Sequence, residues 1–290
     1  ISDSDIGDDI PVGWGVLTGI EPIEVDKDTA DPATWIDYIA LDKSHITAVS
    51  AVYDDDGNSL TFTFSATTGI IRVTSVDGDG EVIEAKYVNC TGKTACNIGE
   101  IITEVLADNE NLTYIEGIWD VTETDSYIAI APDLSFYFDG GTTRDLIEDV
   151  LKNDIAFCFR KHDGRMTIRR WGEDYVNHQL PSWPITQAPE KNFEDATDKF
   201  CSSARIKCNP FPVDDLYQNS FLNDTSERDI FSRYRRSYRF ELETCLTSES
   251  DAEDLADRVI ERFGDIRETI EISLGVNCYD VNLLDTVEIE

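Results

Sequence analysis

Residues 140–171, GGTTRDLIEDVLKNDIAFCFRKHDGRMTIRRW, decide the fold, because they predict a capped helix followed by a tight hairpin. Thr142 caps the helix and Asp145 reaches back to it, which makes a Thr-x-x-Asp variant of the capping box. The apolar residues of this helix share one face: Leu146, Ile147, Val150 and Leu151. The helix therefore has one side to bury against a core.

The hairpin follows directly after this helix. Strand-like runs at 155–160 and 165–171 flank His162-Asp163-Gly164, and an Asp-Gly pair between two such runs is a strong hairpin signal. No reactive constellation is visible here. The sequence therefore predicts that the helix and hairpin form a structural module.

Working outward, short strand-like runs separated by turn residues fill residues 1–93, and they predict a β-rich domain built as a small barrel or sandwich. Residues 94–178 predict an α+β domain with a helix from Asn97, strands at 112–118, 127–131 and 134–138, and then the helix-hairpin module.

A Pro-rich connector at 180–189 separates the third predicted domain, 179–290, which is α+β or barrel-like. In it, Ser250 and Glu253 predict a capping box for a helix that Gly264 closes. Strands are expected on both sides of this helix. The fold class is therefore a multi-domain, β-rich α+β protein with about three amphipathic helices.

Charge is the most unusual property of the composition. The chain of 290 residues has a formal net charge of −35 and is 41% hydrophobic, which is enough apolar material for real cores. Residues 1–143 carry 28 acids against 5 Lys and Arg, net −23, whereas 144–290 carry 31 against 19, net −12. Such a field disfavours nucleic-acid binding and anionic membranes. Two interpretations remain, a surface adapted to saline surroundings and a surface that repels polyanions.

No apolar run approaches the roughly 20 residues of a membrane span, and no signal peptide is visible, so no membrane insertion by this segment is expected. The chain begins at Ile1 without Met and ends at Glu290 within a predicted strand, which is consistent with a piece of a longer protein. The seven cysteines are scattered at spacings that match neither zinc nor Cys-x-x-Cys redox motifs, so reduced, structural thiols are expected.

Arginines gather in two places in this acidic chain. The first group lies on the hairpin and the second lies between residues 228 and 239; the interface candidates among them are Arg160, Arg165, Arg169, Arg170, Arg233, Arg235 and Arg236. Adjacent strand residues point to opposite faces, so Arg169 and Arg170 cannot form one nucleic-acid patch. Because guanidinium binds carboxylates bidentately, the pattern favours subunit contacts over phosphate binding. Changing Arg169 and Arg170 to Glu is then expected to weaken assembly more than folding.

Several oxygen-rich or titratable motifs are candidate sites. The segments 54–58 and 77–81 invite a calcium interpretation, but each lacks Gly at the sixth loop position and flanking helices, so hairpin turns are expected. A glycosidase-like carboxylate pair would use Glu116 and Asp120, although acids are so frequent that the pairing carries little information. The histidines lie far apart and outside metal-binding motifs: His45, His162 and His178. No catalytic residue, metal site or cofactor is predicted.

Three elements together resemble the tail hub or tail-tip (baseplate hub-like) proteins of tailed bacteriophages. They are the opening Pro11-Val12-Gly13-Trp14-Gly15-Val16, the module at 140–171, and the helix, strand, turn and strand at 250–290. Arg262-Phe263-Gly264-Asp265 is similar to the family's helix end. Leu284-Asp285-Thr286-Val287 departs from the family's Gly-Asp turn at Leu284.

The resemblance implies a virion structural protein without enzymatic activity, located in the phage tail tip and assembled in the host cytoplasm. It would join the tail tube to the distal tip or fibres as a homo-oligomer, most often a homotrimer, in contact with tail tube, distal tail and fibre or tip proteins. DNA would meet it only in transit, through a lumen that an acidic wall keeps from adsorbing the duplex.

A function of a different class stays open as the alternative, namely an extracellular carbohydrate-active enzyme or carbohydrate-binding module from a salt-adapted organism. This function needs a concave site with exposed aromatic residues and a carboxyl group of raised pKa. The pool of such aromatics is Trp14, Trp35, Trp119, Trp171 and Trp183.

Overall fold

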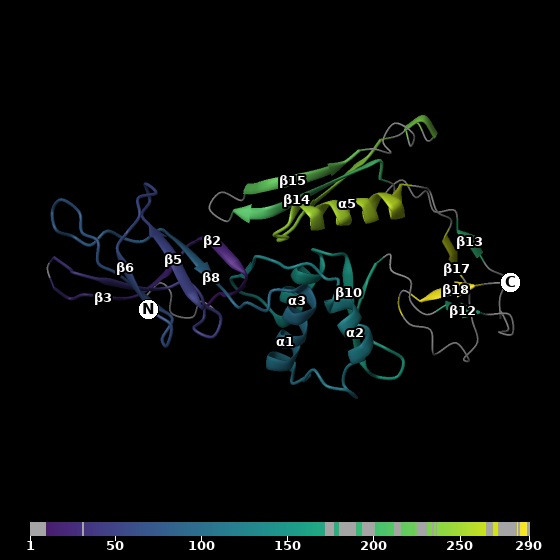
Figure 1. Ribbon diagram of the computed structural model, residues 1–290, viewed down its shortest axis with the longest axis horizontal. Helices are drawn as coiled ribbons and strands as arrows, with labels where there is room; N and C mark the ends of the chain where they lie inside the picture. The colour runs from purple at the N-terminus through teal and green to yellow at the C-terminus, as the bar shows by residue number, and fades with distance from the viewer. Residues whose placement is uncertain are drawn as a thin grey trace.

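The computed structural model shows a mixed α+β, β-rich protein of several small sheets and packed helices (Figure 1). It describes residues 10–30, 32–171, 177–179, 190–192, 201–211, 216–224, 231–233, 235, 237–264, 269–271, 283 and 285–288. The molecule is elongated, with the N-terminal strands at one end and the helices in the middle. The predicted fold class is confirmed.

Two antiparallel sheets form the N-terminal part. One has the order β3 (Ile23–Lys27), β4 (Ile36–Ile39), β7 (Ile70–Val73) and β6 (Phe62–Ser65); the other has the order β2 (Val16–Ile20), β8 (Tyr87–Thr91) and β5 (Ala48–Tyr53). Both sheets contribute buried side chains to one hydrophobic cluster, including Leu17, Ile36, Ile71 and Val88. Burial alternates along β7 and β8, as the short apolar-polar runs predict, whereas Ile36, Asp37 and Tyr38 of β4 are all buried.

The middle of the chain carries three helices and two strand pairs. The helices are α1 (Ile98–Glu110), α2 (Val121–Ile128) and α3 (Thr143–Leu151). The strand pairs are β10 (Ala156–Arg160) with β11 (Met166–Arg170), and β1 (Val12–Trp14) with β9 (Phe136–Phe138), both antiparallel. The β1–β9 pair joins the start of the chain to its middle.

The capped helix and hairpin predicted from residues 140–171 are confirmed. The backbone amide of Thr142 donates to Asp145 at 2.9 Å, and the amide of Asp145 donates to the Thr142 hydroxyl at 3.2 Å. The predicted start of α1 is also confirmed, because the Asn97 side chain accepts a hydrogen bond from the Gly99 amide. These predictions rest on local hydrogen bonding, which the tertiary structure leaves unchanged.

Three local predictions are wrong. Residues 127–131 are not a strand, because α2 runs through 121–128 from the cap Asp120, whose carboxylate accepts from the Glu123 amide at 3.3 Å. Residues 112–118 do not form a strand either, since the chain turns there around Gly117, whose φ is +94°. The last helix is capped by Ser248 rather than Ser250: the Ser248 hydroxyl accepts from the Ser250 amide at 3.2 Å.

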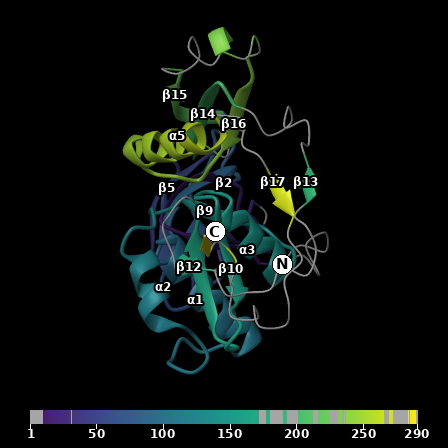
Figure 2. The same ribbon diagram turned by 90° about the vertical axis from the view of Figure 1, so that its right-hand side faces the viewer.

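A second α/β unit follows the connector. β14 (Ser203–Phe211) is central, with β15 (Leu216–Asn223) antiparallel on one side and β16 (Arg239–Glu243) parallel on the other. Helix α5 (Glu249–Phe263) lies along this sheet (Figure 2). It covers the face that carries Ala204, Ile206 and Cys208, all of which are buried.

Short strand pairs lie toward the end of the chain. β12 (Asn177–Gln179) pairs in parallel with β18 (Thr286–Glu288), and β13 (Glu190–Asn192) pairs antiparallel with β17 (Thr269–Glu271). β17 is the strand expected after the last helix, and the residues on either side of it lie outside the described residues. The β12–β18 pair brings the chain end beside the segment that follows the hairpin.

The larger hydrophobic cluster extends across the middle of the chain and the α5 unit. It includes Trp14 and Trp119 together with Ile206, Leu246 and Val259. In the described part of the chain, the predicted second and third domains therefore pack on a common core. The N-terminal sheets keep a separate one.

Gly15 gives a direct test of how the N-terminal part joins the middle. Its φ is +76°, and a Cβ there would lie 2.4 Å from the Leu134 carbonyl oxygen; Gly57 has a φ of +80° and open space around it. We expect Gly57→Ala to lower the free energy of unfolding by roughly 1–2 kcal/mol from backbone strain alone. Gly15→Ala should cost about 1–3 kcal/mol more, because backbone atoms must move apart. Urea unfolding measures the free energy of unfolding of both variants. Equal losses would show that the backbone around Leu134 moves to accommodate the added methyl group at little cost.

Candidate functional site

The arginine-rich hairpin makes ion pairs to both of its sides. In β10–β11, Phe157 faces Arg169 and Ala156 faces Arg170 across the ladder. The turn closes through the Gly164 amide, which donates to the Lys161 carbonyl at 2.9 Å, and Gly164 has a φ of +87°. Arg169 and Arg170 therefore point to opposite sides of the hairpin, and each side has its own set of carboxylates.

The first set of carboxylates comes from the start of α2. Lys161 donates to Asp120 at 2.8 Å and to Glu123 at 2.7 Å, and Arg165 reaches Asp120 at 3.2 Å. Burial by itself raises the pKa of Asp120, but hydrogen bonds from Lys161 and the Glu123 amide outweigh it and hold that pKa below its ordinary value. The Asp120 carboxylate therefore both caps α2 and forms ion pairs with the hairpin.

Arg169 extends this set to the end of the chain. It is 0% exposed and donates to Glu123, to Asp285 at 2.7 Å and to the Leu283 carbonyl at 2.6 Å. Burial alone would lower the pKa of this guanidinium, but the bonds to Glu123 and Asp285 outweigh burial and raise it. The Asp285 side chain is also fully buried, so the ion pair with Arg169 compensates a charge that water does not reach.

The second set centres on Asp154, which follows α3 and is 1% exposed. Its carboxylate accepts from Arg170 at 2.7 Å, from Arg258 of α5 at 2.5 Å, and from the Tyr127 hydroxyl of α2 at 3.1 Å. Burial raises the pKa of Tyr127 well above its ordinary value, so this phenol stays a donor. One carboxylate therefore ties the hairpin, α2 and α5 together.

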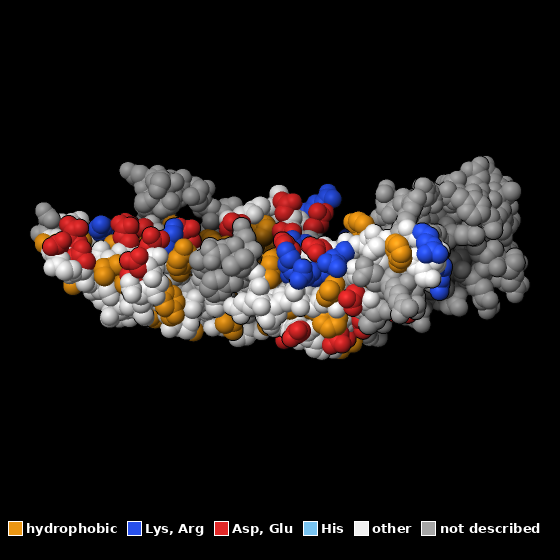
Figure 3. Space-filling view, turned by 90° about the horizontal axis from the view of Figure 1, so that it is seen from above, with side chains coloured by type: hydrophobic (Ala, Val, Ile, Leu, Met, Phe, Trp, Pro, Cys, Tyr) orange, Lys and Arg blue, Asp and Glu red, His pale blue; other side chains and the backbone are white. Residues whose placement is uncertain are grey.

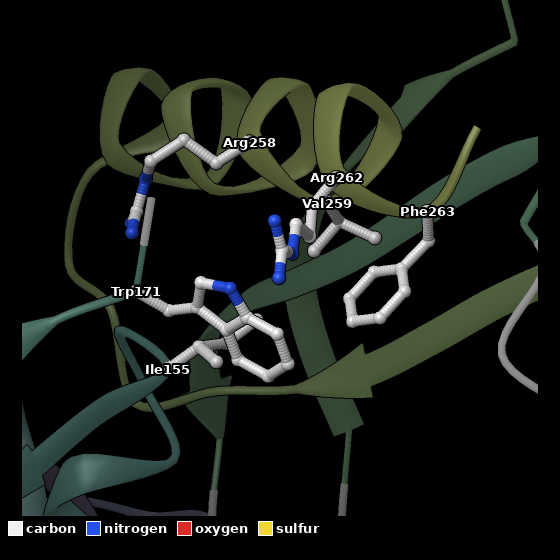
Figure 4. A pocket seen from close by; sticks show the side chains of 6 residues that line it. All are labelled: Ile155, Trp171, Arg258, Val259, Arg262 and Phe263. Atoms are coloured by element: carbon white, nitrogen blue, oxygen red, sulfur yellow. The ribbon is translucent and has the colours of Figure 1, made fainter. Parts of the chain in front are cut away.

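Beside this set, aromatic packing closes the contact between the hairpin and α5 (Figure 4). The rings of Trp171 and Phe263 meet edge to face at 5.4 Å, and the Arg262 guanidinium lies 5.3 Å from the centre of the Trp171 ring. A cavity of about 20 Å³ remains between them. This is room for about one water molecule, so the contact is packing rather than a ligand site.

The seven interface candidates differ sharply in their surroundings. Arg169 and Arg170 are held by carboxylates of their own chain, and Arg165 pairs with Asp163 at 2.6 Å while keeping a side chain 38% exposed. Arg160, Arg233 and Arg235 are exposed, and Arg236 lies outside the described residues. Replacing Arg169 and Arg170 would therefore act on folding first. The subunit-contact hypothesis now concerns the exposed members.

The candidates for carbohydrate chemistry do not come together. Trp14 and Trp119 are buried in the core, Arg72 covers Trp35 at 4.1 Å, and Trp171 packs against Phe263. Trp183 lies outside the described residues. The pKa of Asp120 is lowered, whereas a glycosidase acid needs a raised one.

The Asp-rich segments are turns, as predicted. The Asp54 carboxylate accepts from the Asn58 amide at 2.7 Å, and the Asp77 carboxylate accepts from the Asp79 and Glu81 amides at 2.9 Å each. In the part of the chain that can be described, no three His, Cys, Asp or Glu side chains gather as a metal site. Six cysteines are free thiols there, while Cys278 falls outside it.

A groove of about 420 Å³ separates β2 from the tip of the β14–β15 hairpin. Its lining includes Val16 and Thr18 of β2, Asn209 and Gln218 of the β14–β15 hairpin, and Asp133 from the loop between α2 and β9. None of the described residues that line it is aromatic. No helix among the described residues is both long and apolar enough to cross a bilayer.

Comparison with known proteins yields likeness of structure only. No protein-family model matches the sequence, and none of the curated proteins compared with it does. The fold is similar to a chain of the virion of a native gene transfer agent particle, with a TM-score of 0.61 and 9% identity over 91% of this chain and 74% of that one.

Two further solved structures are more distant. The tail protein from Neisseria meningitidis MC58 has a TM-score of 0.34 and 10% identity, over 92% of this chain and 80% of that one. The 43 kDa tail protein of prophage MuSo2 from Shewanella oneidensis has a TM-score of 0.32 and 11% identity, over 88% and 76%. At these scores only the first likeness establishes a shared fold.

Removing Arg169 tests the buried pair. Arg169→Met should lower the free energy of unfolding by about 3–5 kcal/mol, because the largely buried carboxylates of Glu123 and Asp285 both lose the guanidinium that they share. The matched control is Arg144→Met, which removes an ion pair to Glu148 on a side chain 83% exposed and should cost at most about 0.5 kcal/mol. Chemical unfolding followed by circular dichroism measures both. Similar small losses would mean that water reaches Asp285.

Asp251 provides a test by pH. Burial, and then the charges of Asp254 and Asp133, raise its pKa above the ordinary 3.8. Ionising the Asp251 carboxyl therefore costs more free energy in the folded chain than in the unfolded chain, and this cost destabilises the fold at neutral pH. Asp251→Asn should raise the free energy of unfolding at pH 7, and the gain should shrink as the pH falls toward 3.8.

The control for this test has the opposite sign. The Thr142 amide and hydroxyl lower the pKa of Asp145, so its contribution to stability is present above the ordinary pKa and is lost as the pH falls through the folded value. Asp145→Asn should therefore destabilise the protein at pH 7 and do so less in acid. Urea midpoints across a pH series measure both variants, and the same sign for both would contradict the electrostatic explanation.

Proposed function

We propose that this chain is a virion structural protein of a phage-like tail, a hub or tail-tip component that joins the tail tube to the distal tip or fibres. The observation that carries the proposal is the fold likeness, at a TM-score of 0.61 over 91% of the chain, to a chain of a gene transfer agent virion. The order of the opening motif, the helix-hairpin module and the late helix supports the hub position within the tail.

The internal electrostatics suit a structural role. The buried ionisable groups at the hairpin are engaged with each other, as Arg169 is with Asp285 and Arg170 is with Asp154. Such pairs fix the relative positions of the hairpin, the segment after α3 and the chain end. A component that transmits load between a tube and a tip needs this rigidity.

The proposed assembly is a homo-oligomeric ring, expected to be a trimer, in contact with the tail tube, the distal tail and the fibre or tip proteins. The net charge of −23 over residues 1–143 suits a lumen wall, because like charge keeps passing DNA from adsorbing. A neutral or basic channel wall in the assembled ring would contradict this lumen assignment.

Locating the chain in purified particles tests the role. An epitope tag on this chain, imaged by immunogold labelling and by cryo-electron microscopy, should mark the distal end of the tail tube and show threefold density there. A tag on a tube subunit is the control and should label the whole length of the tube. Label on the capsid, or an untagged chain that stays monomeric and binds or cleaves glycans, would contradict the proposal.

A further inference from the structure

A short segment before β16 exposes arginine and aromatic side chains together. We call it the Arg/aromatic arm, and its described members are Phe231, Arg233, Arg235, Tyr238 and Arg239. The two aromatic residues are large and poorly covered, with exposures of 47% for Phe231 and 57% for Tyr238, and the three arginines are exposed as well. Arginine with aromatic residues is the composition enriched at the centres of protein interfaces.

The arm is held in place at its base. The Tyr238 amide donates to the hydroxyl of the buried Ser202 at 2.8 Å, and the Ser202 amide donates to the Tyr238 carbonyl at 2.8 Å. Within the arm, the Arg235 amide donates to the Phe231 carbonyl at 2.8 Å. A surface anchored in this way loses less conformational entropy when a partner binds.

The charge of the arm is opposite to that of the rest of the chain. Residues 230–239, IFSRYRRSYR, hold four arginines and no acid, in a chain of net charge −35. In contrast, the described residues 10–93 carry 13 acids against 5 Lys and Arg, net −8. Acidic side chains spread over the N-terminal end, and Lys and Arg gather farther along the molecule (Figure 3).

Position decides how these surfaces can meet. The segment that contains Phe231 and Arg233 projects beyond the open end of the β14–β15 hairpin, which is the end opposite its turn and away from the N-terminal sheets (Figure 1). The cationic and acidic surfaces of one copy therefore cannot meet each other. Contact between different surfaces of two copies is heterologous, and its repetition gives a closed ring or an open filament.

We propose that the Arg/aromatic arm of one copy binds the acidic N-terminal part of a second copy. Asp55 and Asp56 in the exposed turn after β5 are the probes of that acidic surface. The occupant is a protein rather than a nucleic acid, because the field of the whole chain repels a polyanion before it reaches the arm. This inference deepens the proposed function, since it assigns surfaces to the ring on which that function rests.

The experiment measures self-association of the full purified chain by sedimentation and light scattering. The wild type should self-associate, and added salt should weaken the association because exposed charges are screened. R233E/R235E should weaken it by about tenfold or more, and Y238A should also weaken it. The matched control R144E/K152E changes the net charge equally at exposed positions of α3 and its end, and should associate as the wild type does.

The reciprocal variant makes the partner surface testable. D55K/D56K should weaken association by itself. Combined with R233E/R235E in one chain, it should restore association, because the reversed charges again attract each other across the contact. Thermal unfolding of each variant by circular dichroism should match the wild type, since all four side chains are exposed.

Several results would overturn the inference. They are a wild type that stays monomeric at every concentration, an R233E/R235E chain that associates normally, a combined variant that stays dissociated, and duplex DNA binding that R233E/R235E abolishes. The proposed function fails separately, through particle location: a chain that assembles through the arm but is absent from tails contradicts the tail role alone. A chain found at the tail tip whose association ignores the arm contradicts this inference alone.

Discussion

The burial of the Asp154 carboxylate is the constraint on which the other contacts of the middle of the chain depend. A carboxylate that is 1% exposed is tolerated only when donors replace its water, and here Arg170, Arg258 and Tyr127 do so from the hairpin, α5 and α2. Displacing any of these elements removes one of the donors that compensate this buried charge. The ion pairs therefore add less to net stability than to the uniqueness of the arrangement, in which three elements have one acceptable position.

Sequence reasoning succeeds where the deciding interactions are local. Two such interactions are the capping box of Thr142 and Asp145 and the turn at Asp163-Gly164, each between residues a few positions apart. The local sequence therefore predicts α3 and the β10–β11 hairpin. Helix α2 has a comparable signal in the sequence, because Asp120 is followed three residues later by Glu123. The prediction of a strand at 127–131 gives more weight to the apolar residues there than to this cap. A cap signature deserves more weight than a short apolar run, because such a run fits a strand and a buried helix end equally well.

The partners of the arginines could not be predicted in this way. Arg169 and Asp285 are 116 residues apart, and Arg258 and Asp154 are 104 apart, so only the folded topology brings them together. Clustering in the sequence predicts that cations need carboxylates but does not say whether those carboxylates belong to the same chain. The two clusters differ in burial. Arg169 and Arg170 pair with carboxylates of their own chain in the interior, whereas Phe231, Arg233 and Tyr238 are exposed.

That separation bears on how so acidic a chain could form a ring. Placing several N-terminal parts around one axis concentrates like charge, and the repulsion grows with each added copy. Buried cations such as Arg169 cannot relieve it, because their charge is already matched by Glu123 and Asp285. Only exposed cations can act as counter-charge between copies. In the proposed ring the Arg/aromatic arm supplies this charge at each contact, while its aromatic residues add burial that salt does not screen.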